Sequence, residues 1–279
     1  MLLRKPLKCG IVPHPLEYED LRQFYILITR MCNANCPYCI ESKVNTGGFM
    51  TEETFINCIK KAKSLDLRTL DLHGGEPTIH PNVVHFAKLA KEWGFRVHMF
   101  TNGICEDVLR QLDGIVDEIR FSYEPGREYM FKNQADWKSR IKLYIMATEE
   151  SYPTEQSLMA VVNRSLDLGM DVKVRTLNPI NPYAYKHQFV HYLHRKLLEL
   201  PKEDIFCDGN KAAYRMDHGV IVRLGNMQLN PGHLKFSFDP DGNLHDHFDH
   251  SDKRLIVPDP QIELLKDKFE PLRQELINI

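Results

Sequence analysis

Short apolar runs alternate with amphipathic helical patterns along the chain as far as residue 176. Six runs predict buried strands because they are rich in β-branched and aromatic residues and are bounded by turn residues. They cover residues 24–29, 69–72, 95–101, 118–122, 142–148 and 171–176. Helical patterns cover residues 51–62, 81–93, 105–112 and 154–168. This alternation predicts an α/β fold with a parallel sheet, and because six units are too few for a closed barrel of eight strands, we expect a partial (β/α)6 barrel.

The pattern changes after one more predicted helix at residues 185–200. Short β-like runs with turn residues between them occupy residues 212–245, and an apolar face over residues 262–276 predicts a closing helix. We therefore expect an N-terminal segment (1–23), a barrel core (24–205), and a small β-rich C-terminal extension with a hairpin and a terminal helix (206–279). Because ligands of such folds bind at the carboxyl ends of the strands, the residues that follow each strand are the candidates for a site.

The overall charge excludes two classes of partner. The formal net charge is -2, so no strong field attracts nucleic acid or an anionic membrane. The N-terminus lacks the apolar core of a signal peptide, and charges interrupt each hydrophobic run before it could span a bilayer. We expect a cytoplasmic protein that uses neither a membrane nor nucleic acid.

Three of the seven cysteines are concentrated in one loop directly after the first predicted strand. Cys32, Cys36 and Cys39 stand within eight residues, and thiolates at such spacing bind an iron–sulfur cluster or zinc. Three ligands on a cubane of four irons would leave one iron open to an outside ligand. The alternative is a zinc site completed by a distant histidine, or a non-catalytic cluster. Of the scattered cysteines, Cys58 fits a buried apolar position on a helix.

A second motif, Gly74-Gly-Glu-Pro77, follows the second predicted strand. The two glycines would let a ligand approach the backbone, and the carboxylate of Glu76 could accept hydrogen bonds from an ammonium group. Taken alone, the same four residues are also compatible with a plain turn.

In this order and spacing, the two motifs resemble those of the radical S-adenosylmethionine (radical SAM) superfamily, and the resemblance covers residues 24–180. It implies that Cys32, Cys36 and Cys39 hold a [4Fe-4S] cluster whose open iron binds the methionine part of S-adenosylmethionine. It also implies reductive cleavage of this cofactor to a 5'-deoxyadenosyl radical that takes hydrogen from a substrate. An electron donor such as flavodoxin or ferredoxin is implied as a partner.

The resemblance also assigns cofactor contacts residue by residue. Candidates are Tyr38 for the adenine, Gly74, Gly75 and Glu76 for the methionine amino group, Thr101 and Asn102 after the third strand, and Ser122 after the fourth. At the ends of the fifth and sixth strands, Thr148 and Leu177 are possible ribose and adenine contacts. Many relatives continue from the serine with Leu-Asp-Gly, whereas this chain has Ser122-Tyr-Glu-Pro125. Either Arg127 or Lys132 could bind the cofactor carboxylate, and the distance in sequence favours Lys132.

Residues 236–247 resemble the β-hairpin of the SPASM or twitch extension of peptide-modifying relatives. Those proteins place a cluster-binding cysteine where this chain has His247, so we expect no auxiliary cluster. Cys207 could return a hydrogen atom to a substrate radical, although a buried filler role is the alternative. His245, His247 and His250 could bind a metal or touch the substrate, and the alternative is a solvated polar loop.

Two enzymatic hypotheses follow for the substrate. The hairpin suggests a peptide or amino-acid-like substrate, whereas the short chain and the missing auxiliary ligands suggest a nucleoside or another small metabolite. We expect residues 207–250 to pack over the mouth formed by the strand ends, with Tyr183, Tyr185 and His247 as substrate contacts.

Overall fold

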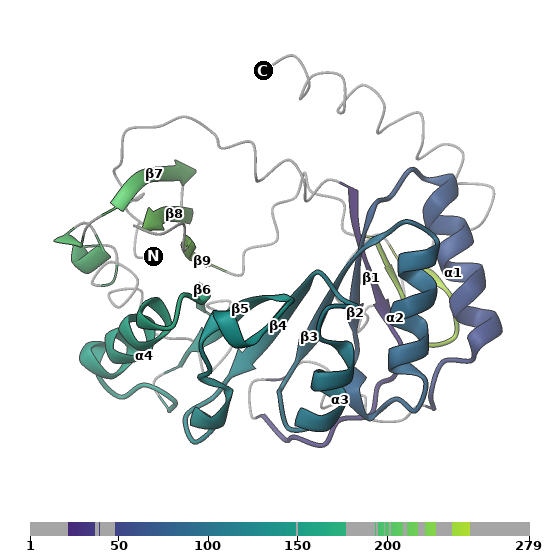
Figure 1. Ribbon diagram of the computed structural model, residues 1–279, viewed down its shortest axis with the longest axis horizontal. Coiled ribbons are helices and arrows are strands. Elements are labelled where there is room, and N and C mark those ends of the chain that lie inside the picture. Colours follow the sequence, from purple (N-terminus) through teal and green to yellow (C-terminus); the bar gives the residue numbers. More distant parts are fainter. Residues whose placement is uncertain are drawn as a thin grey trace, which may run out of the picture. The chain divides into compact units, whose positions relative to one another are not determined.

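The computed structural model describes residues 22–36, 39, 48–148, 150–176, 193, 195–197, 199–200, 202–208, 211–216, 221–226 and 236–245. Between residues 202 and 226 it describes the backbone and the side chains of Tyr214, Met216 and Val222. These residues fall into two compact units (Figure 1). The first unit lies within residues 15–117 and 231–279, and the second within residues 118–230. No helix among all of these described residues is long and apolar enough to cross a bilayer.

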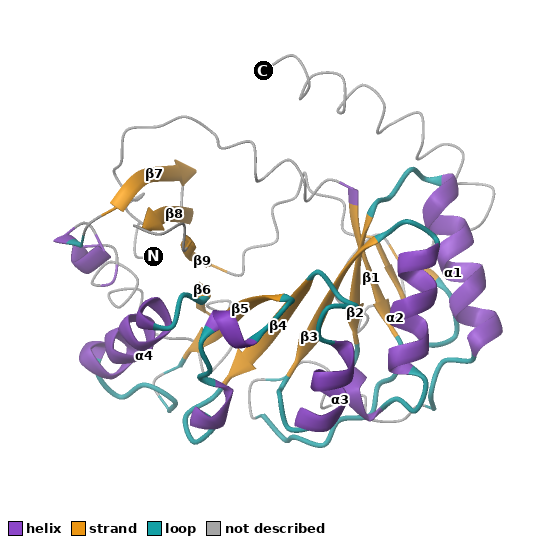
Figure 2. Cartoon of the chain, viewed as in Figure 1, coloured by secondary structure: helices purple, strands orange, loops and turns teal. Residues whose placement is uncertain are grey.

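The first unit is built on a mostly parallel sheet. Its strands lie in the order β11(Leu244–His245), β10(Phe236–Phe238), β1(Gln23–Leu27), β2(Thr69–His73) and β3(Arg96–Thr101). All neighbours are parallel except β11, which pairs antiparallel with β10. The helices α1(Glu52–Ser64), α2(Val83–Glu92) and α3(Glu106–Leu112) lie side by side along one face (Figure 2). The 3-10 turn η3(Pro77–Ile79) follows β2.

The helices of this unit form where capping and apolar spacing agree. Thr51 caps α1 by accepting a hydrogen bond from the Thr54 N–H, and acidic residues fill its first turn. The buried face of α1 includes Phe55, which stacks on Phe86 of α2 with ring centroids 4.3 Å apart. Helix α2 begins at Val83, two residues beyond the expected proline start, and Gly94 with a φ of +77° follows its end.

The second unit continues the alternation of parallel strands and helices and then adds antiparallel strands. Its strands lie in the order β4(Glu118–Tyr123), β5(Arg140–Ala147), β6(Asp171–Thr176), β9(Ile221–Asn226), β8(Lys211–Met216) and β7(Lys202–Asp208). The first four are parallel, and β8 is antiparallel to both of its neighbours. The capped helix α4(Glu155–Asp167) connects β5 to β6. Two 3-10 turns, η4(Glu128–Met130) and η5(Gln134–Asp136), connect β4 to β5.

All six strands and four helices predicted before residue 177 are confirmed, with ends shifted by at most two residues. Strand β7 was not predicted, since its apolar centre is short and flanked by charged residues. The division into residues 1–23, 24–205 and 206–279 stays a prediction. The expected helices at 185–200 and 262–276 lie wholly or largely outside the described residues.

The predicted hairpin is confirmed, but one of its histidines differs from the expectation. β10 adds to the sheet beside β1, and the turn is closed by Asp239, whose carboxylate accepts hydrogen bonds from the N–H groups of Asp241 and Asn243 at 3.0 and 2.9 Å. His245 Nε2 lies 3.0 Å from Asp239 Oδ2, and both side chains are buried. A solvated loop is therefore wrong for His245, because this residue lies in strand β11 and its side chain is buried. His247 and His250 lie outside the described residues.

The Asp239–His245 pair is expected to make the stability of the protein depend on pH in the acid range. Burial alone would raise the pKa of Asp239, but hydrogen bonds from His245 and Asn243 outweigh it and lower the pKa to about 2. A lowered folded-state pKa adds stability above the ordinary value, and this is lost as the pH falls from about 4 toward about 2. In Asp239→Asn, the change in the free energy of unfolding between about pH 5 and pH 2 should be about 1–2 kcal/mol smaller than in the wild type, after allowance for solvent screening.

Urea unfolding at several values of pH between about 5 and 2 measures this dependence. Asp241 is an exposed residue of the same turn, so Asp241→Asn serves as the control. Its free energy of unfolding should change with pH as steeply as that of the wild type. Equal slopes for the wild type and Asp239→Asn would show that the pair contributes nothing to acid stability.

Candidate active site

The three cysteines of the loop after β1 are half-buried, and none of them forms a disulfide. The Cys39 N–H donates to the Cys36 carbonyl at 3.0 Å, which turns the chain between these two residues. The Ala34 N–H donates to Cys32 Sγ at 3.3 Å. Burial raises the pKa of the Cys32 thiol, the charges of Glu76 and Cys39 add to this, and the Ala34 hydrogen bond opposes it. A thiolate at Cys32 is therefore favoured by a cationic partner such as iron.

The two glycines of the second motif are required by the chain itself. A Cβ on Gly74 would lie 2.5 Å from the Thr29 carbonyl oxygen, and one on Gly75 would lie 2.2 Å from that of Met31. The N–H groups of Gly75 and Glu76 donate to these same carbonyls at 2.9 and 2.8 Å. We expected the two glycines to leave space for a ligand. On the side where their Cβ atoms would lie, that space is instead filled by the backbone that precedes Cys32. The glycines fix where the cysteine loop starts.

Glu76 lies buried where the second and third strands end. Its Oε1 accepts hydrogen bonds from Thr78 N, Thr78 Oγ1 and Thr101 Oγ1 at 3.0, 2.6 and 2.8 Å, and its Oε2 accepts one from Asn102 N at 2.6 Å. Burial raises the pKa of Glu76, and these hydrogen bonds oppose the rise. A desolvated carboxylate of this kind gains from a nearby cation, and an ammonium group would supply one.

The structure thus brings the predicted residues of the first three strand ends together. Asn102 Nδ2 donates to Cys32 Sγ at 3.8 Å and to Asn33 Oδ1 at 2.8 Å. Asn33 Nδ2 in turn donates to Cys105 Sγ at 3.5 Å, at the start of α3. Sequence reasoning did not single out Asn33, and its place inside the cysteine loop was the available signal. Cys105 was treated as scattered, yet it lies beside this network.

The remaining candidates belong to the second unit or lie outside the described residues. Ser122 lies near the carboxyl end of β4 and is exposed, and its carbonyl accepts a 3.4 Å hydrogen bond from Arg127. Lys132 is half-buried beyond η4, so both candidates for the cofactor carboxylate remain open. Cys207 lies in β7, where the backbone alone is described. Four candidates lie outside the described residues: Tyr38, Leu177, Tyr183 and Tyr185.

Glu124, directly after β4, is a further polar residue that sequence reasoning passed over. Its Oε2 accepts a hydrogen bond from Ser151 Oγ at 2.9 Å, and Ser151 Oγ accepts one from Thr148 Oγ1 at 2.9 Å. Its other oxygen is buried with no hydrogen-bond partner among the described residues. Burial raises the pKa of Glu124, Ser151 and Arg127 oppose the rise, and Glu150 adds to it. A polar residue directly after a strand end was the signal that could have found it.

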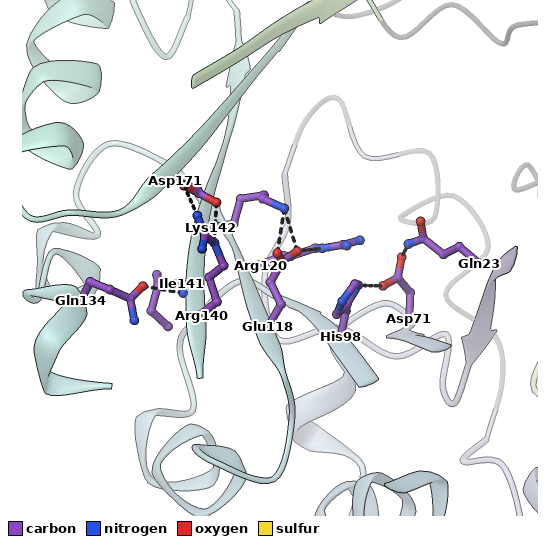
Figure 3. Close-up of polar contacts among 10 residues, drawn as sticks. All are labelled: Gln23, Asp71, His98, Glu118, Arg120, Gln134, Arg140, Ile141, Lys142 and Asp171. Atoms are coloured by element: carbon purple, nitrogen blue, oxygen red, sulfur yellow. Dashed lines mark hydrogen bonds and ion pairs between the residues drawn. The ribbon is translucent and has the colours of Figure 1, made fainter. Parts of the chain in front are cut away.

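The strands β4 to β6 have one apolar and one polar face. Residues in register share the polar face: Glu118, Arg120 and Ser122 on β4, Arg140, Lys142, Tyr144 and Met146 on β5, and Asp171, Lys173 and Arg175 on β6. Figure 3 shows Glu118 bound by Lys142 Nζ at 2.8 Å and by Arg120, and Arg140 Nε at 2.7 Å from Asp171. Lys173 and Arg175 lie over the ring of Tyr144 at 5.5 and 5.1 Å. In the first unit, Asp71 accepts a hydrogen bond from the Gln23 amide, and its Oδ1 lies 3.2 Å from His98 Nδ1 (Figure 3).

Residues 26–175 match the family model of the Radical SAM superfamily, which is over half of the chain. The chain belongs to the radical SAM superfamily. Members of this superfamily are enzymes that bind a [4Fe-4S] cluster and S-adenosylmethionine, so the predictions of enzyme class and cofactors are confirmed. Which residues of this chain bind them stays a prediction.

Relatives of this radical SAM protein carry different names. A probable GTP 3',8-cyclase of Saccharolobus islandicus (strain L.S.2.15 / Lassen #1) is 36% identical over 287 positions, which cover 93% of this chain and 91% of that protein. An S-adenosylmethionine-dependent nucleotide dehydratase of Thermoplasmatales archaeon (strain ISO4-H5) is 30% identical over 113 residues. That match covers 39% of this chain and 41% of the relative, so the chain spans less than half of the dehydratase.

Among solved structures, Streptococcus suis SuiB bound to S-adenosylmethionine matches with a TM-score of 0.65 at 10% identity, over 88% of this chain and 65% of SuiB. At that identity the likeness bears on the fold alone, and it confirms the α/β class and the partial barrel of a radical SAM enzyme. The likeness to a SPASM or twitch extension stays a prediction.

The side chains of the cysteine loop are chemically suited to bind a [4Fe-4S] cluster. Three soft thiol ligands stand on one loop, and N–H donors from Ala34 and Asn102 point at Cys32 Sγ, as is common around iron–sulfur clusters. Among the described residues no three His, Cys, Asp or Glu side chains converge on one point that could hold a single metal ion. Thiolates on separate corners of a cubane need not converge in that way.

Proposed function

We propose that this radical SAM enzyme holds its cluster on Cys32, Cys36 and Cys39 and binds the methionine end of S-adenosylmethionine beside Glu76. When bound and reduced, the cluster supplies one electron that cleaves S-adenosylmethionine to methionine and a 5'-deoxyadenosyl radical, which abstracts hydrogen from the substrate. The chain's own residues orient the cofactor and keep water away. The buried carboxylate of Glu76 would accept hydrogen bonds from the ammonium group, and its hydrogen bonds from Thr101 and Asn102 would hold the ends of the second and third strands together.

For the substrate, the charge on the polar face of β4–β6 favours an anionic nucleotide or nucleoside phosphate. Five cations share this face with two carboxylates, Glu118 and Asp171, an excess of three positive charges. The cations are Arg120, Arg140, Lys142, Lys173 and Arg175. In partial barrels the face without helices lines the interior, where a substrate binds. The relatives named as a GTP cyclase and a nucleotide dehydratase support the same class.

A peptide or amino-acid-like substrate is the second candidate. It is supported by the resemblance of residues 236–247 to the hairpin of peptide-modifying relatives and by the confirmed β10–β11 hairpin. In both cases we keep flavodoxin or ferredoxin as the electron donor and a cytoplasmic location as parts of the proposal.

Binding of the four common ribonucleoside triphosphates tests whether the substrate is a nucleotide. One or more should bind the reconstituted enzyme and accelerate 5'-deoxyadenosine formation. Arg175→Gln should weaken binding about tenfold or more, since hydrogen bonds to charged groups contribute roughly 1.5–3 kcal/mol, and affinity should fall with added salt. Arg164→Gln, an exposed residue of α4, is the matched control and should bind like the wild type.

Anaerobic calorimetry gives the affinities, and chromatography gives the rate of 5'-deoxyadenosine formation. If no triphosphate binds, the nucleotide class is wrong, and short peptides become the next probe. If a triphosphate binds equally well to Arg175→Gln, the charge of the polar face does not select the substrate.

A further inference from the structure

The side-chain amide of Asn102 has one defined orientation. Its Oδ1 accepts a hydrogen bond from the Ile104 N–H at 3.0 Å, so the Nδ2 group must point the other way. There it donates to Asn33 Oδ1 at 2.8 Å and to Cys32 Sγ at 3.8 Å. Exchanging the oxygen and nitrogen would place two donors face to face at Ile104 and two oxygens face to face at Asn33. The amide therefore presents an N–H group to the sulfur of Cys32.

The backbone around Asn102 is held as firmly as its side chain. The Asn102 N–H donates to Glu76 Oε2 at 2.6 Å, and the preceding Thr101 hydroxyl donates to Glu76 Oε1 at 2.8 Å. Asn102 is 7% exposed and Glu76 is 1% exposed, so water competes little for these bonds. On the other side, Asn33 is tied to Cys105 Sγ at 3.5 Å. The N–H group thus reaches Cys32 from a fixed position.

An N–H donor directed at a cluster thiolate changes the energy of the two redox states unequally. The reduced cluster carries one more negative charge, so the same N–H dipole stabilises it more and raises the reduction potential. We propose that Asn102 is a positioning residue that raises the reduction potential of the cluster through Cys32, and that Asn33 keeps the Asn102 amide in place. This inference rests on the proposed function, because it requires that Cys32 binds the cluster.

The test is a redox titration of the anaerobically reconstituted full chain without S-adenosylmethionine, followed by electron paramagnetic resonance. Asn102→Ala should lower the ratio of reduced to oxidised cluster at a fixed potential about tenfold, or about 59 mV for one electron. Asn102→Asp should lower it further, since it replaces the donor with a negative charge. Asn33→Ala should produce a smaller shift in the same direction. Asn82→Asp, exposed before α2, adds the same charge elsewhere and should titrate like the wild type.

Iron and sulfide contents near four each per chain, measured in every variant, keep the comparison valid. Wild-type midpoints in the Asn102 variants would overturn the inference and leave the contact as packing. A folded Asn102 variant that holds no cluster would also overturn it, because the residue would then serve cluster assembly. Failure of the proposed function looks different, since the wild type itself would then give no cluster signal, or Cys32→Ala would leave it unchanged.

Discussion

Purified without oxygen, the chain is expected to carry four irons and four sulfides, all held by Cys32, Cys36 and Cys39. Replacing the three residues together with Ala should remove essentially all visible cluster absorbance, because in the proposed assignment the loop supplies every protein ligand and a cubane is not retained without thiolates. Iron and sulfide assays with the absorption spectrum measure this. The expected loss of the cluster is complete.

Two controls separate this loss from unfolding and from a second cluster. Cys58→Ala removes a buried thiol on α1 and should keep the full cluster content. Circular dichroism should show the helices of the triple variant intact. A [4Fe-4S] signal that survives in the triple variant would reveal an auxiliary site and contradict the expectation drawn from His247.

The second large effect concerns Glu76. Glu76→Gln keeps the size of the buried side chain but removes the charge that would face the ammonium group of S-adenosylmethionine, and it places an amide NH2 group against one of the donors that the carboxylate accepts from. A charge-assisted hydrogen bond contributes roughly 1.5–3 kcal/mol, so affinity for S-adenosylmethionine should fall about ten- to a hundredfold while the cluster stays assembled. Calorimetry under anaerobic conditions measures the two dissociation constants.

Glu53→Gln is the matched control, because Glu53 is exposed in the first turn of α1. Its affinity for S-adenosylmethionine should equal that of the wild type. If Glu76→Gln also binds with wild-type affinity, Glu76 has no charged contact with the cofactor, and its four hydrogen bonds are a purely structural brace between the second and third strand ends.

The sequence predicted the order of elements well because local patterns determine them. The alternation of β-forming runs with capped amphipathic helices identified every strand from β1 to β6, and the Asp239-Pro-Asp-Gly242 turn identified the hairpin. Strand β7 escaped because a short apolar centre between charges gives a weak pattern. The strand forms because it pairs antiparallel with β8, the next strand along the chain, with Asp208 opposite Lys211.

The contacts inside the site could not be predicted in the same way. The spacing of the motifs indicated that Cys32, Glu76 and Asn102 would lie close together, since the carboxyl ends of parallel strands share an edge. It did not indicate that the glycines pack on the backbone of Thr29 and Met31. Such contacts join residues dozens of positions apart, and they depend on loop geometry that no periodicity encodes. The buried partner of His245, Asp239, is close in sequence, but the contact depends on the geometry of the tight turn between β10 and β11, which no periodicity encodes.

Cleavage of S-adenosylmethionine by the reduced protein tests the proposed function most directly. Reduced, cluster-loaded protein incubated anaerobically with S-adenosylmethionine should release 5'-deoxyadenosine and methionine in equal amounts, as quantified by liquid chromatography and mass spectrometry. The triple variant of Cys32, Cys36 and Cys39 should release neither above the background of the reductant. A fully loaded wild-type protein that forms no 5'-deoxyadenosine, with or without the nucleotide and peptide probes, would contradict the account.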